Sequence, residues 1–332
     1  MKALGSGAAA GIVSTGKALP VCKLTNRDLE HILDTSDEWI TTRTGIKERR
    51  IISGSESGVS LSEIAARTAL ERAGLKADEI DILILSTVTA DLLLPTSACL
   101  LQAKLGATKA AAFDLAAGCT GFLYGLCIGQ QFIESGSAKN ILLVGVDTLS
   151  PIVDWTDRNT AVLFGDGAGA VVMQLMPEGR GILASKLFSD GTKAEFLDIP
   201  TGGSRRPLKR SNIEERNHYI KMNGPEVFKF AVKAMVESTS YVLDMCGKSV
   251  ADLDYLAPHQ ANLRIINAAS KRLGIKESQI LTNISRYGNV SSASIPIVLD
   301  EALEEGKIKS GDLLLLVSFG AGMTWGAAAL NW

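Results

Sequence analysis

Apolar and polar positions alternate along this chain in two recurring patterns. Short, near-continuous apolar runs predict strands buried on both faces of a sheet, at residues 80–87, 111–115, 141–146 and 313–319. Between these runs the apolar residues recur at helical spacing, which predicts helices at residues 60–73, 96–105, 225–245 and 263–273. Regular alternation of buried strands with helices is typical of an α/β fold with helices on both faces of its sheets.

Local signals predict where several elements begin and end. Ser60 and Glu63 have the spacing of a capping box, so we expect a helix to start there and to end at Gly74. The glycine-rich stretch 165–169 precedes a strand rather than a helix, which predicts a tight turn and not a phosphate-binding loop. Weaker patterns predict strands at 11–20, 170–175, 182–187, 254–257 and 325–331, and helices at 24–34, 122–133 and 288–305.

Two polar segments interrupt this alternation. Residues 36–46 form a polar segment that contains an aromatic residue, Trp39, and a basic residue, Arg43. Residues 189–221 are polar and irregular, and a loop of this length usually has a function, so we expect it to form a flap over the functional site. Residues 1–180 and 181–332 contain similar series of helices, buried strands and polar helix entries. They therefore predict two similar α/β halves with a functional site at their seam.

The composition argues against several classes of function. The 332 residues are 46% hydrophobic with a net charge of −2, which predicts a globular protein without the basic excess of a nucleic-acid-binding protein. Five scattered cysteines without a CxxC pair predict free thiols in a reducing cytoplasm, and the three histidines form no zinc-binding pattern. No apolar run is long enough to span a membrane. Residues 1–10 are linker-like and lack the regions of a secretory signal peptide.

The strand at 111–115 is followed by small residues and then by Cys119, at the start of a predicted helix. Free backbone N–H groups and the helix dipole favour a thiolate at such a position, and small neighbours leave room for a substrate carbonyl. This pattern predicts a nucleophilic cysteine. A buried structural cysteine fits the same stretch, because free cysteine is one of the most buried residue types.

Two polar residues in the second half occupy comparable positions. His259 follows the expected strand 254–257, and Asn289 follows Gly288 at a helix entry. Taken singly, a satisfied core histidine and a helix cap or turn asparagine are the more common cases. Together with Cys119 they are better explained as one site for acyl transfer to sulfur, with imidazole and amide donating hydrogen bonds to a thioester enolate. Cysteine hydrolases use the same residue types, so the trio alone leaves both reactions open.

From about residue 11 to residue 332 the chain resembles β-ketoacyl-[acyl carrier protein] synthase III, the initiating condensing enzyme of bacterial fatty-acid synthesis in the thiolase-like superfamily. The similarity rests on many motifs that occur in the same order. These motifs are residues 36–46, 117–121, 156–158, 164–170, 222–232, 258–264, 287–289 and 319–326. The resemblance implies a thiolase-like fold with layered α-β-α-β-α architecture and a homodimer formed near the nucleophile.

The resemblance also implies a decarboxylative condensation. Cys119 accepts the acyl group from an acyl-CoA primer, with acetyl-CoA expected. His259 and Asn289 bind the malonyl thioester of the acyl carrier protein and promote loss of carbon dioxide, and the backbone N–H groups of Cys119 and Gly320 form the oxyanion hole. Coenzyme A enters as a substrate thioester, and no metal or other cofactor is implied.

Binding residues are implied in the same way. Trp39 and Arg158 would stack on the adenine of coenzyme A, whose nucleotide end Arg43 would help to bind; half-buried packing and surface ion pairs are the alternatives for these residues. The remaining substrate-contacting positions are Leu94, Asn262, Phe319 and Gly320. Docking of the acidic carrier protein is implied for Lys229, Gln260, Ala261, Asn262, Leu263, Arg264, Lys271 and Arg272, although basic residues at helical spacing also describe a solvated helix face.

Departures from the family pattern leave the primer open. Leu94 occupies a position that is aromatic in some relatives and helps to wall the acyl pocket across the dimer interface. Ala321 and Met323 replace the usual glycine and phenylalanine near Gly320, and Pro225 replaces Arg or Asn. A secondary-metabolite priming synthase or an acyltransferase of the same fold therefore remains an alternative. A thiol hydrolase and a non-catalytic binding protein are less consistent with these motifs.

Overall fold

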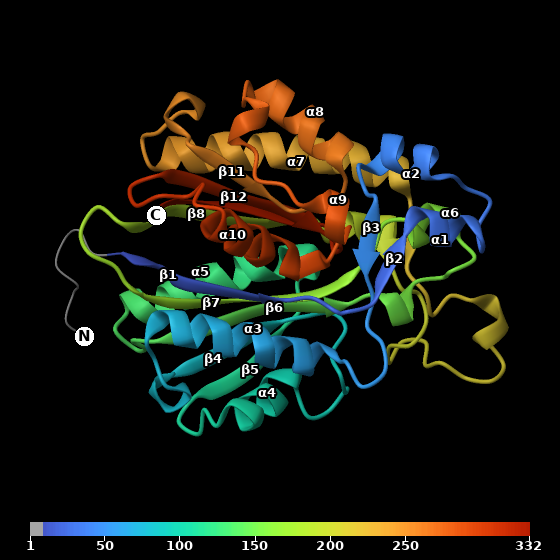
Figure 1. Cartoon of the computed structure of the whole chain (residues 1–332), viewed down its shortest axis with the longest axis horizontal. Coiled ribbons are helices and arrows are strands. Elements are labelled where there is room, and N and C mark those ends of the chain that lie inside the picture. Colours follow the sequence, from blue (N-terminus) through green and yellow to red (C-terminus); the bar gives the residue numbers. More distant parts are fainter. Residues whose placement is uncertain (1–8) are drawn as a thin grey trace.

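Two β-sheets lie one above the other, with two helices between them and a helical layer on each outer side (Figure 1). The computed structural model describes residues 9–332. Residues 1–8, which make up most of the linker-like start, lie outside this described part. The five layers confirm the α/β class and the layered α-β-α-β-α arrangement that the sequence predicts.

The first sheet is mixed, and its parallel strands lie together on one side of the sheet. β4 pairs in parallel with β5 and β6, and β6, β7 and β1 follow in antiparallel pairing. In spatial order the strands are β1 (Ala10–Ala18), β7 (Asp166–Leu175), β6 (Ile141–Thr148), β4 (Ile82–Ser86) and β5 (Ala111–Leu115). α3 (Gly58–Ala73) and α4 (Ser97–Leu105) cover its outer face.

The second sheet repeats this pairing scheme. β11 and β12 are parallel, whereas β12, β13 and β8 are antiparallel neighbours. Its strands are β11 (Tyr255–Pro258), β12 (Leu313–Gly320), β13 (Thr324–Asn331) and β8 (Gly181–Ser189). A single parallel bridge between Leu256 and Ile280 lies beside β11, on the side where β5 lies beside β4 in the first sheet. This repetition supports the division near residue 180, which stays a prediction.

The outer face of the second sheet is covered by α7 (Gly224–Met245), and α8 (Leu263–Leu273) packs beside α7. α5 (Gly121–Glu134) and α10 (Ser294–Glu304) form the middle layer. Successive side chains of each central strand point alternately into two hydrophobic cores, one on each face of the sheet. Leu314 and Leu316 of β12 face the middle helices, whereas Leu313 and Leu315 face α7. This double burial explains why the strands read as near-continuous apolar runs.

Glycines allow the middle helices to lie very close to the first sheet. A Cβ on Gly121 would come within 1.9 Å of Ser86 Oγ, and one on Gly169 would come within 2.8 Å of Pro296. The expected tight turn at residues 165–169 is therefore wrong, because residues 166–169 form the start of β7. Gly167 and Gly169 serve the close approach of α10 rather than a change of chain direction.

Helix ends in the first half differ from the sequence expectations. α3 begins three residues before the predicted capping box: Ser57 is the N-cap, and its side chain accepts from Ser60 N while Ser60 Oγ accepts from Ser57 N. Gly74 ends the helix as predicted, with φ of 67°. Only five residues of the helix expected at 24–34 are helical, because the preceding residues pair with another short strand. These elements are β2 (Lys23–Thr25), α1 (Asn26–Glu30) and β3 (Glu48–Arg50).

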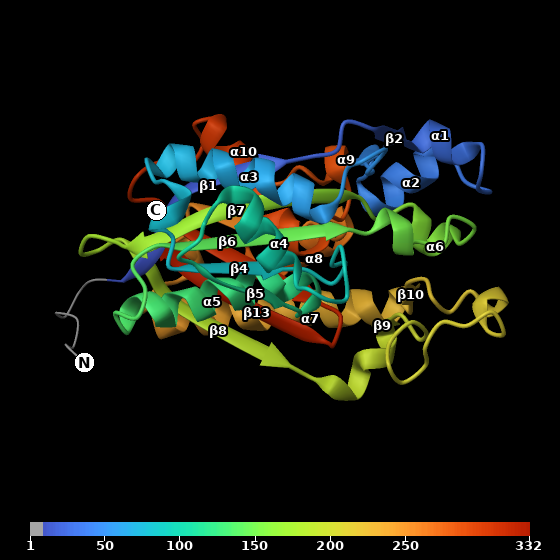
Figure 2. The same cartoon turned by 90° about the horizontal axis from the view of Figure 1, so that it is seen from below.

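Small elements gather at the end of the molecule where the two halves meet (Figures 1 and 2). The polar segment 36–46 is mostly helical, and the irregular segment 189–221 projects from the same end of the molecule with only short regular elements. The elements are α2 (Asp37–Thr44), α6 (Arg158–Ala161), β9 (Leu197–Asp198), β10 (Lys221–Met222) and α9 (Ile284–Tyr287). Among residues 9–332, no helix is long and apolar enough to cross a membrane.

Candidate active site

Cys119 lies between the end of β5 and the start of α5, as the sequence predicts. Gly118 has φ of 55°, in the left-handed region that favours glycine, and Gly118–Thr120 form a single 3-10 turn before the helix begins. The second half fixes this turn, because Ser318 Oγ donates to Cys119 O at 2.8 Å and Thr324 Oγ1 donates to Ala117 O at 3.1 Å. The position of the thiol therefore depends on both halves.

His259 directly follows β11, and its imidazole is only 1% exposed. Its backbone N–H donates to Val317 O at 2.8 Å, which ties it to β12. One ring nitrogen, Nδ1, is 2.7 Å from Ser294 Oγ at the start of α10. The other, Nε2, has no hydrogen-bond partner within residues 9–332, although it is buried. An unpartnered ring nitrogen that lines a cavity is available to a substrate.

Asn289 is held at the seam by its backbone and by its own side chain. Asn289 N donates to Leu163 O at 2.8 Å, and Gly165 N donates to Asn289 O at 3.0 Å. The side-chain Oδ1 accepts from Ser291 N at 2.9 Å, so the amide Nδ2 is the group left to face the cavity. The carboxylate of Asp147, near the end of β6, accepts a hydrogen bond from Ser292 N at 3.2 Å. This bond holds the segment that follows Asn289 in place.

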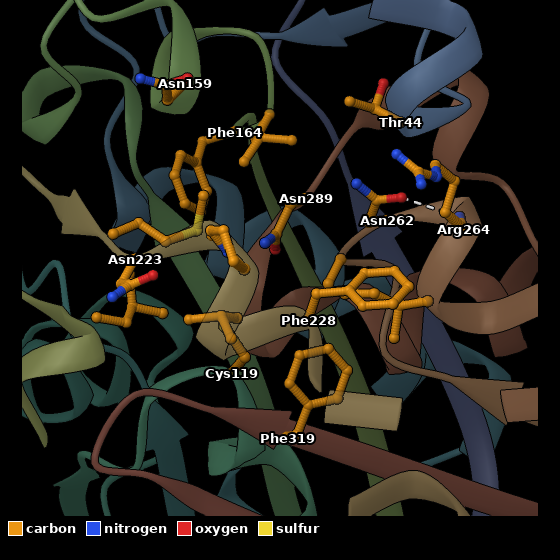
Figure 3. Close-up of a pocket in the computed structure, with 18 of the residues that line it drawn as sticks. Thr44, Cys119, Asn159, Phe164, Asn223, Phe228, Asn262, Arg264, Asn289 and Phe319 are labelled. Atoms are coloured by element: carbon orange, nitrogen blue, oxygen red, sulfur yellow. Dashed lines mark hydrogen bonds between the residues drawn. The ribbon is translucent and has the colours of Figure 1, made fainter. Parts of the chain in front are cut away.

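One cavity of about 850 Å³ is lined by all three side chains, as the sequence predicts. Figure 3 labels Cys119 and Asn289 among the residues that line this cavity. Phe319 also lines it, and its ring contacts the His259 ring edge-on with centroids 5.4 Å apart. The cavity extends from Cys119 to α2, where Trp39 and Arg43 form part of its wall. The residues come from both halves, so the seam is where the expected chemistry would take place.

The electrostatics of the cysteine differ from the sequence expectation. Burial raises the pKa of the Cys119 thiol to about 12, whereas the sequence pattern favours a thiolate at this position. Burial lowers the pKa of His259 to about 3. Both groups are therefore neutral near pH 7, and no thiolate–imidazolium pair forms.

Gly320 lies directly against the nucleophile at the end of β12. A Cβ at this position would be 2.7 Å from Cys119 N and 3.0 Å from Cys119 Cβ. Because Gly320 has no side chain, the space beside the thiol stays open, and the backbone N–H groups of Cys119 and Gly320 can lie near each other. This geometry is compatible with an oxyanion hole made of backbone donors.

The aromatic and basic residues expected to bind coenzyme A lie together at the outer end of the cavity. Arg43 and Arg158 lie over the Trp39 ring, with guanidinium carbons 4.9 and 4.8 Å from its centroid. Arg158 Nη1 also donates to Asp34 O at 2.7 Å. No gap for a base exists between Trp39 and Arg158 in this arrangement, so the expected sandwich requires Arg158 to swing away.

The expected docking residues divide into three groups. Four of them line the cavity, namely Lys229, Ala261, Asn262 and Arg264. Leu263 is half-buried and packs against Gly45, while Lys271 and Arg272 are exposed in the last turn of α8. The exposed basic side chains thus lie on two helices, with Lys229 on α7 and Arg264, Lys271 and Arg272 on α8. A solvated helix face remains the alternative for them.

Gln260 does not fit a surface contact. Its side chain is fully buried, donates to Pro258 O at 2.7 Å and to Leu281 O at 3.2 Å, and accepts from Thr282 Oγ1 at 2.8 Å. The docking role expected for Gln260 is therefore wrong, because these bonds occupy its amide inside the protein. The sequence could not show this, since a glutamine beside a catalytic histidine is equally compatible with exposure.

A second, smaller cavity is also lined by Cys119. It has a volume of about 190 Å³ and is lined mainly by apolar residues that the sequence analysis missed, among them Val88, Leu149, Ile152, Ile199 and Ile220. Their one signal in the sequence is that Ile199 and Ile220 are apolar residues within a polar segment. Leu94 lines neither cavity within a single chain and is 85% exposed.

The described residues hold no cluster of three or more His, Cys, Asp or Glu side chains that could bind a metal ion. All five cysteines, Cys22, Cys99, Cys119, Cys127 and Cys246, are free thiols. Cys119 is the one among them that lines both cavities.

Comparisons with known proteins extend along the whole chain. Residues 113–191 match the family model for 3-oxoacyl-[acyl-carrier-protein (ACP)] synthase III, and residues 243–332 match the model for its C-terminal part. The β-ketoacyl-[acyl-carrier-protein] synthase III of Caldanaerobacter subterraneus subsp. tengcongensis is 53% identical over 324 residues, which cover 98% of each chain.

Solved structures share the fold over nearly the full length. The crystal structure of 3-oxoacyl-[acyl-carrier-protein] synthase III from Aquifex aeolicus VF5 matches with a TM-score of 0.90 at 46% identity, over 97% of this chain and 100% of that chain. The priming β-ketosynthase of the R1128 polyketide biosynthetic pathway matches with a TM-score of 0.90 at 33% identity, over 97% and 96% of the two chains.

Proposed function

The chain belongs to the 3-oxoacyl-[acyl-carrier-protein] synthase III family of acyl-transferring condensing enzymes in fatty-acid biosynthesis, and from this we propose that it condenses acetyl-CoA with malonyl-acyl carrier protein through an acyl-Cys119 intermediate. The family membership confirms the resemblance described above. The observation that carries the proposed mechanism is the convergence of Cys119, His259 and Asn289 in one cavity at the seam of the two halves.

The first half-reaction acylates the cysteine. Cys119 Sγ attacks the thioester carbonyl of the primer, the new carbon–sulfur bond forms, and coenzyme A leaves and takes up the proton that the thiol loses. The N–H groups of Cys119 and Gly320 stabilise the oxyanion of the tetrahedral intermediate. Because the free thiol is neutral, deprotonation is coupled to attack rather than completed before it.

The second half-reaction needs a pair of hydrogen-bond donors. His259 Nε2 and Asn289 Nδ2 bind the thioester oxygen of malonyl-acyl carrier protein and stabilise the enolate that forms when carbon dioxide leaves. The enolate carbon attacks the acyl-Cys119 carbonyl, a carbon–carbon bond forms, and Cys119 departs and is reprotonated. The β-ketoacyl group stays on the carrier protein, and no metal or further cofactor is needed.

The proposal is tested by incubating the protein with radiolabelled acyl-CoAs from acetyl to lauroyl, including branched chains, and then adding malonyl-acyl carrier protein. We expect acetyl-CoA to label Cys119 rapidly and the label to move to a β-ketoacyl product. Labelling only by longer or branched chains would replace the proposed primer. Labelling without carbon–carbon bond formation would support the acyltransferase alternative instead.

A priming synthase of secondary metabolism remains the second candidate, because the R1128 priming β-ketosynthase shares the fold at 33% identity. The small apolar cavity beside Cys119 supports an acyl-binding role but does not select one chain length. The same acyl-CoA panel separates the two candidates, since a priming synthase with a different primer prefers a chain other than acetyl.

Gly320 provides a sharp test of the oxyanion hole. Gly320→Ala places a methyl group against Cys119 N and displaces the backbone donors, so we expect the rate of Cys119 acylation to fall about 10²-fold. Rapid-quench mass spectrometry of the acyl-enzyme measures this rate. Gly191→Ala is the matched control, because a Cβ there meets no atom within 4 Å and should leave the rate unchanged. Wild-type acylation by Gly320→Ala would exclude the proposed hole.

Trp39 tests the proposed nucleotide contact. We expect Trp39→Ala to raise the KM for acetyl-CoA about 10-fold, because loss of base stacking costs about 1–3 kcal/mol per base, while kcat changes little. Steady-state kinetics with acetyl-CoA and with acetyl-pantetheine give the comparison. The nucleotide-free substrate is the control, and an equal increase in KM for both thioesters would contradict a contact with the base.

We further propose a homodimer formed through β5. This strand is at the edge of its sheet and only partly buried, and Leu92, Leu93 and Leu94 beside it are 49%, 102% and 85% exposed. An open strand edge flanked by apolar side chains is a favourable association surface. In such a dimer Leu94 reaches the partner's acyl pocket, which would explain why it lines no cavity of its own chain.

Leu93→Asp places a charge in this surface, and we expect it to convert the dimer to a monomer in sedimentation-velocity experiments. Ile32→Asp is the control, because Ile32 is 56% exposed but lies after α1, far along the chain from β5. A wild-type protein that sediments as a monomer would refute the proposed assembly.

Carrier-protein docking and location complete the proposal. An acidic carrier protein would contact Lys229, Arg264, Lys271 and Arg272, which extend from the cavity along α7 and α8. Such a contact predicts condensation rates that fall with rising salt. The free thiols and the substrates of this reaction support a cytoplasmic location, which is also part of the proposal.

A further inference from the structure

The His259 imidazole has one partnered and one unpartnered nitrogen. Nδ1 is 2.7 Å from Ser294 Oγ, and Nε2 has no partner within residues 9–332. The ring is neutral near pH 7 because burial lowers its pKa, so it carries a single proton. The proton lies either on Nδ1 or on Nε2, and the two tautomers offer opposite chemistry to a substrate.

The Ser294 hydroxyl determines which tautomer is favoured. Ser294 is 1% exposed, and its Oγ accepts a hydrogen bond from Gln260 N at 3.3 Å. Among the described residues, His259 Nδ1 is the one partner to which the hydroxyl proton can be donated. If Nδ1 carried the ring proton, the hydroxyl would only accept, and its own proton would be buried without an acceptor. A buried donor without an acceptor is costly, so Nδ1 is the accepting nitrogen.

The backbone around His259 is held independently of Ser294. His259 N donates to Val317 O at 2.8 Å. The buried Gln260 side chain donates to Pro258 O and Leu281 O, and thereby fixes the segment on either side of the histidine. Removal of the Ser294 hydroxyl therefore changes the hydrogen bonding of the ring more than the path of the chain.

We propose that Ser294 is a positioning residue that holds His259 in its Nε2–H tautomer, so that the imidazole donates a hydrogen bond into the active site. The inference rests on the proposed function, in which His259 Nε2 binds the thioester oxygen of the malonyl substrate. It also has a consequence for the first half-reaction. An Nε2 that carries the proton has no lone pair for the Cys119 thiol, so His259 does not act as the base in acylation.

The tautomer is measured directly on the full-length protein without substrate. With ¹⁵N-labelled histidine, long-range ¹H–¹⁵N spectra distinguish a protonated from an unprotonated ring nitrogen, and three histidines are few enough to assign by substitution of His31 and His218. We expect wild-type His259 to show a protonated Nε2 and an unprotonated Nδ1. S294A should show a mixture of tautomers, and S294T, which keeps the hydroxyl, should show the wild-type pattern.

Kinetics test the consequence of the tautomer. We expect S294A to lower kcat for condensation about 10- to 100-fold, the usual cost of removing a group that orients a ligand-binding histidine. Acylation of Cys119 should stay within about 2-fold, because the histidine is not its base. S238A is the matched control: Ser238 is an equally buried serine whose hydroxyl bonds only Ala234 O of its own helix. Thermal unfolding of all three variants verifies that they fold.

The outcomes separate this inference from the proposed function. A protonated Nδ1 in wild-type His259, or an unchanged tautomer in S294A, would overturn the role of Ser294. If S294A loses the tautomer but condenses at the wild-type rate, the positioning of the ring stands while the proposed donor role of His259 fails. Loss of the single tautomer together with a lower kcat that S294T restores supports both.

Discussion

Cys119→Ala is expected to abolish formation of the acyl-enzyme and to lower condensation about 10⁴-fold or more, because Cys119 is the one cysteine among the described residues that line the larger cavity. Decarboxylation of malonyl-acyl carrier protein should persist in this variant. The hydrogen-bond donors proposed for that step belong to His259 and Asn289, whose contacts do not involve the thiol. The two half-reactions would thus be separated by a single substitution.

Intact-protein mass spectrometry after incubation with acetyl-CoA measures the acyl-enzyme, and release of labelled carbon dioxide measures decarboxylation. Cys127→Ala is the control. Cys127 is half-buried like Cys119, but it lies within α5 and lines neither cavity. It should acylate at the wild-type rate. A stable acyl adduct on Cys119→Ala would assign the nucleophile to another residue.

Each half of the protein positions a reactive group of the other half. The turn that carries Cys119 in the first half is bonded by Ser318 of β12 in the second. Conversely, Asn289 of the second half is bonded by Leu163 and Gly165 of the first. A reaction that needs the nucleophile and the enolate donors within one cavity therefore depends on the packing of the halves.

The sequence predicted those features that depend on local patterns. The bounds of β5 and α8 agree with the predicted ranges, and Gly74 ends α3 as expected. The candidate trio could also be predicted, because Cys119, His259 and Asn289 each follow a strand or open a helix. In an α/β fold, such positions gather at one edge of the sheets.

Features that depend on contacts between distant segments could not be predicted. Residues 165–169 look like a turn because of their glycines, but at Gly167 and Gly169 the need for glycine comes from α10, which packs against the strand. β5 reads as a buried strand although it lies at a sheet edge. The raised pKa of the Cys119 thiol results from burial, which depends on residues far along the chain and is not visible in the local sequence.

The largest expected effect in the second half of the site is that of His259→Ala. This change removes the Nε2–H donor, and loss of one donor to a developing oxyanion usually costs about 10²–10³-fold in rate. We expect decarboxylation and condensation to fall by about this factor. Acylation of Cys119 should stay within about 10-fold, because the primer carbonyl is stabilised by backbone N–H groups. Burst labelling with acetyl-CoA and release of carbon dioxide are measured on the same preparation.

This split between the half-reactions also distinguishes a condensing enzyme from a thiol hydrolase. In a hydrolase the histidine is the base that takes the cysteine proton, so its loss would abolish acylation as well. His218→Ala is the control, because His218 lies in the segment 189–221 and lines neither cavity. If His259→Ala loses acylation and decarboxylation equally, the histidine acts as a base, and both its donor role and the assignment of its proton to Nε2 are wrong. If acylation survives, His259 acts in the reaction as a neutral hydrogen-bond donor. This is the role that its burial and its bond to Ser294 predict.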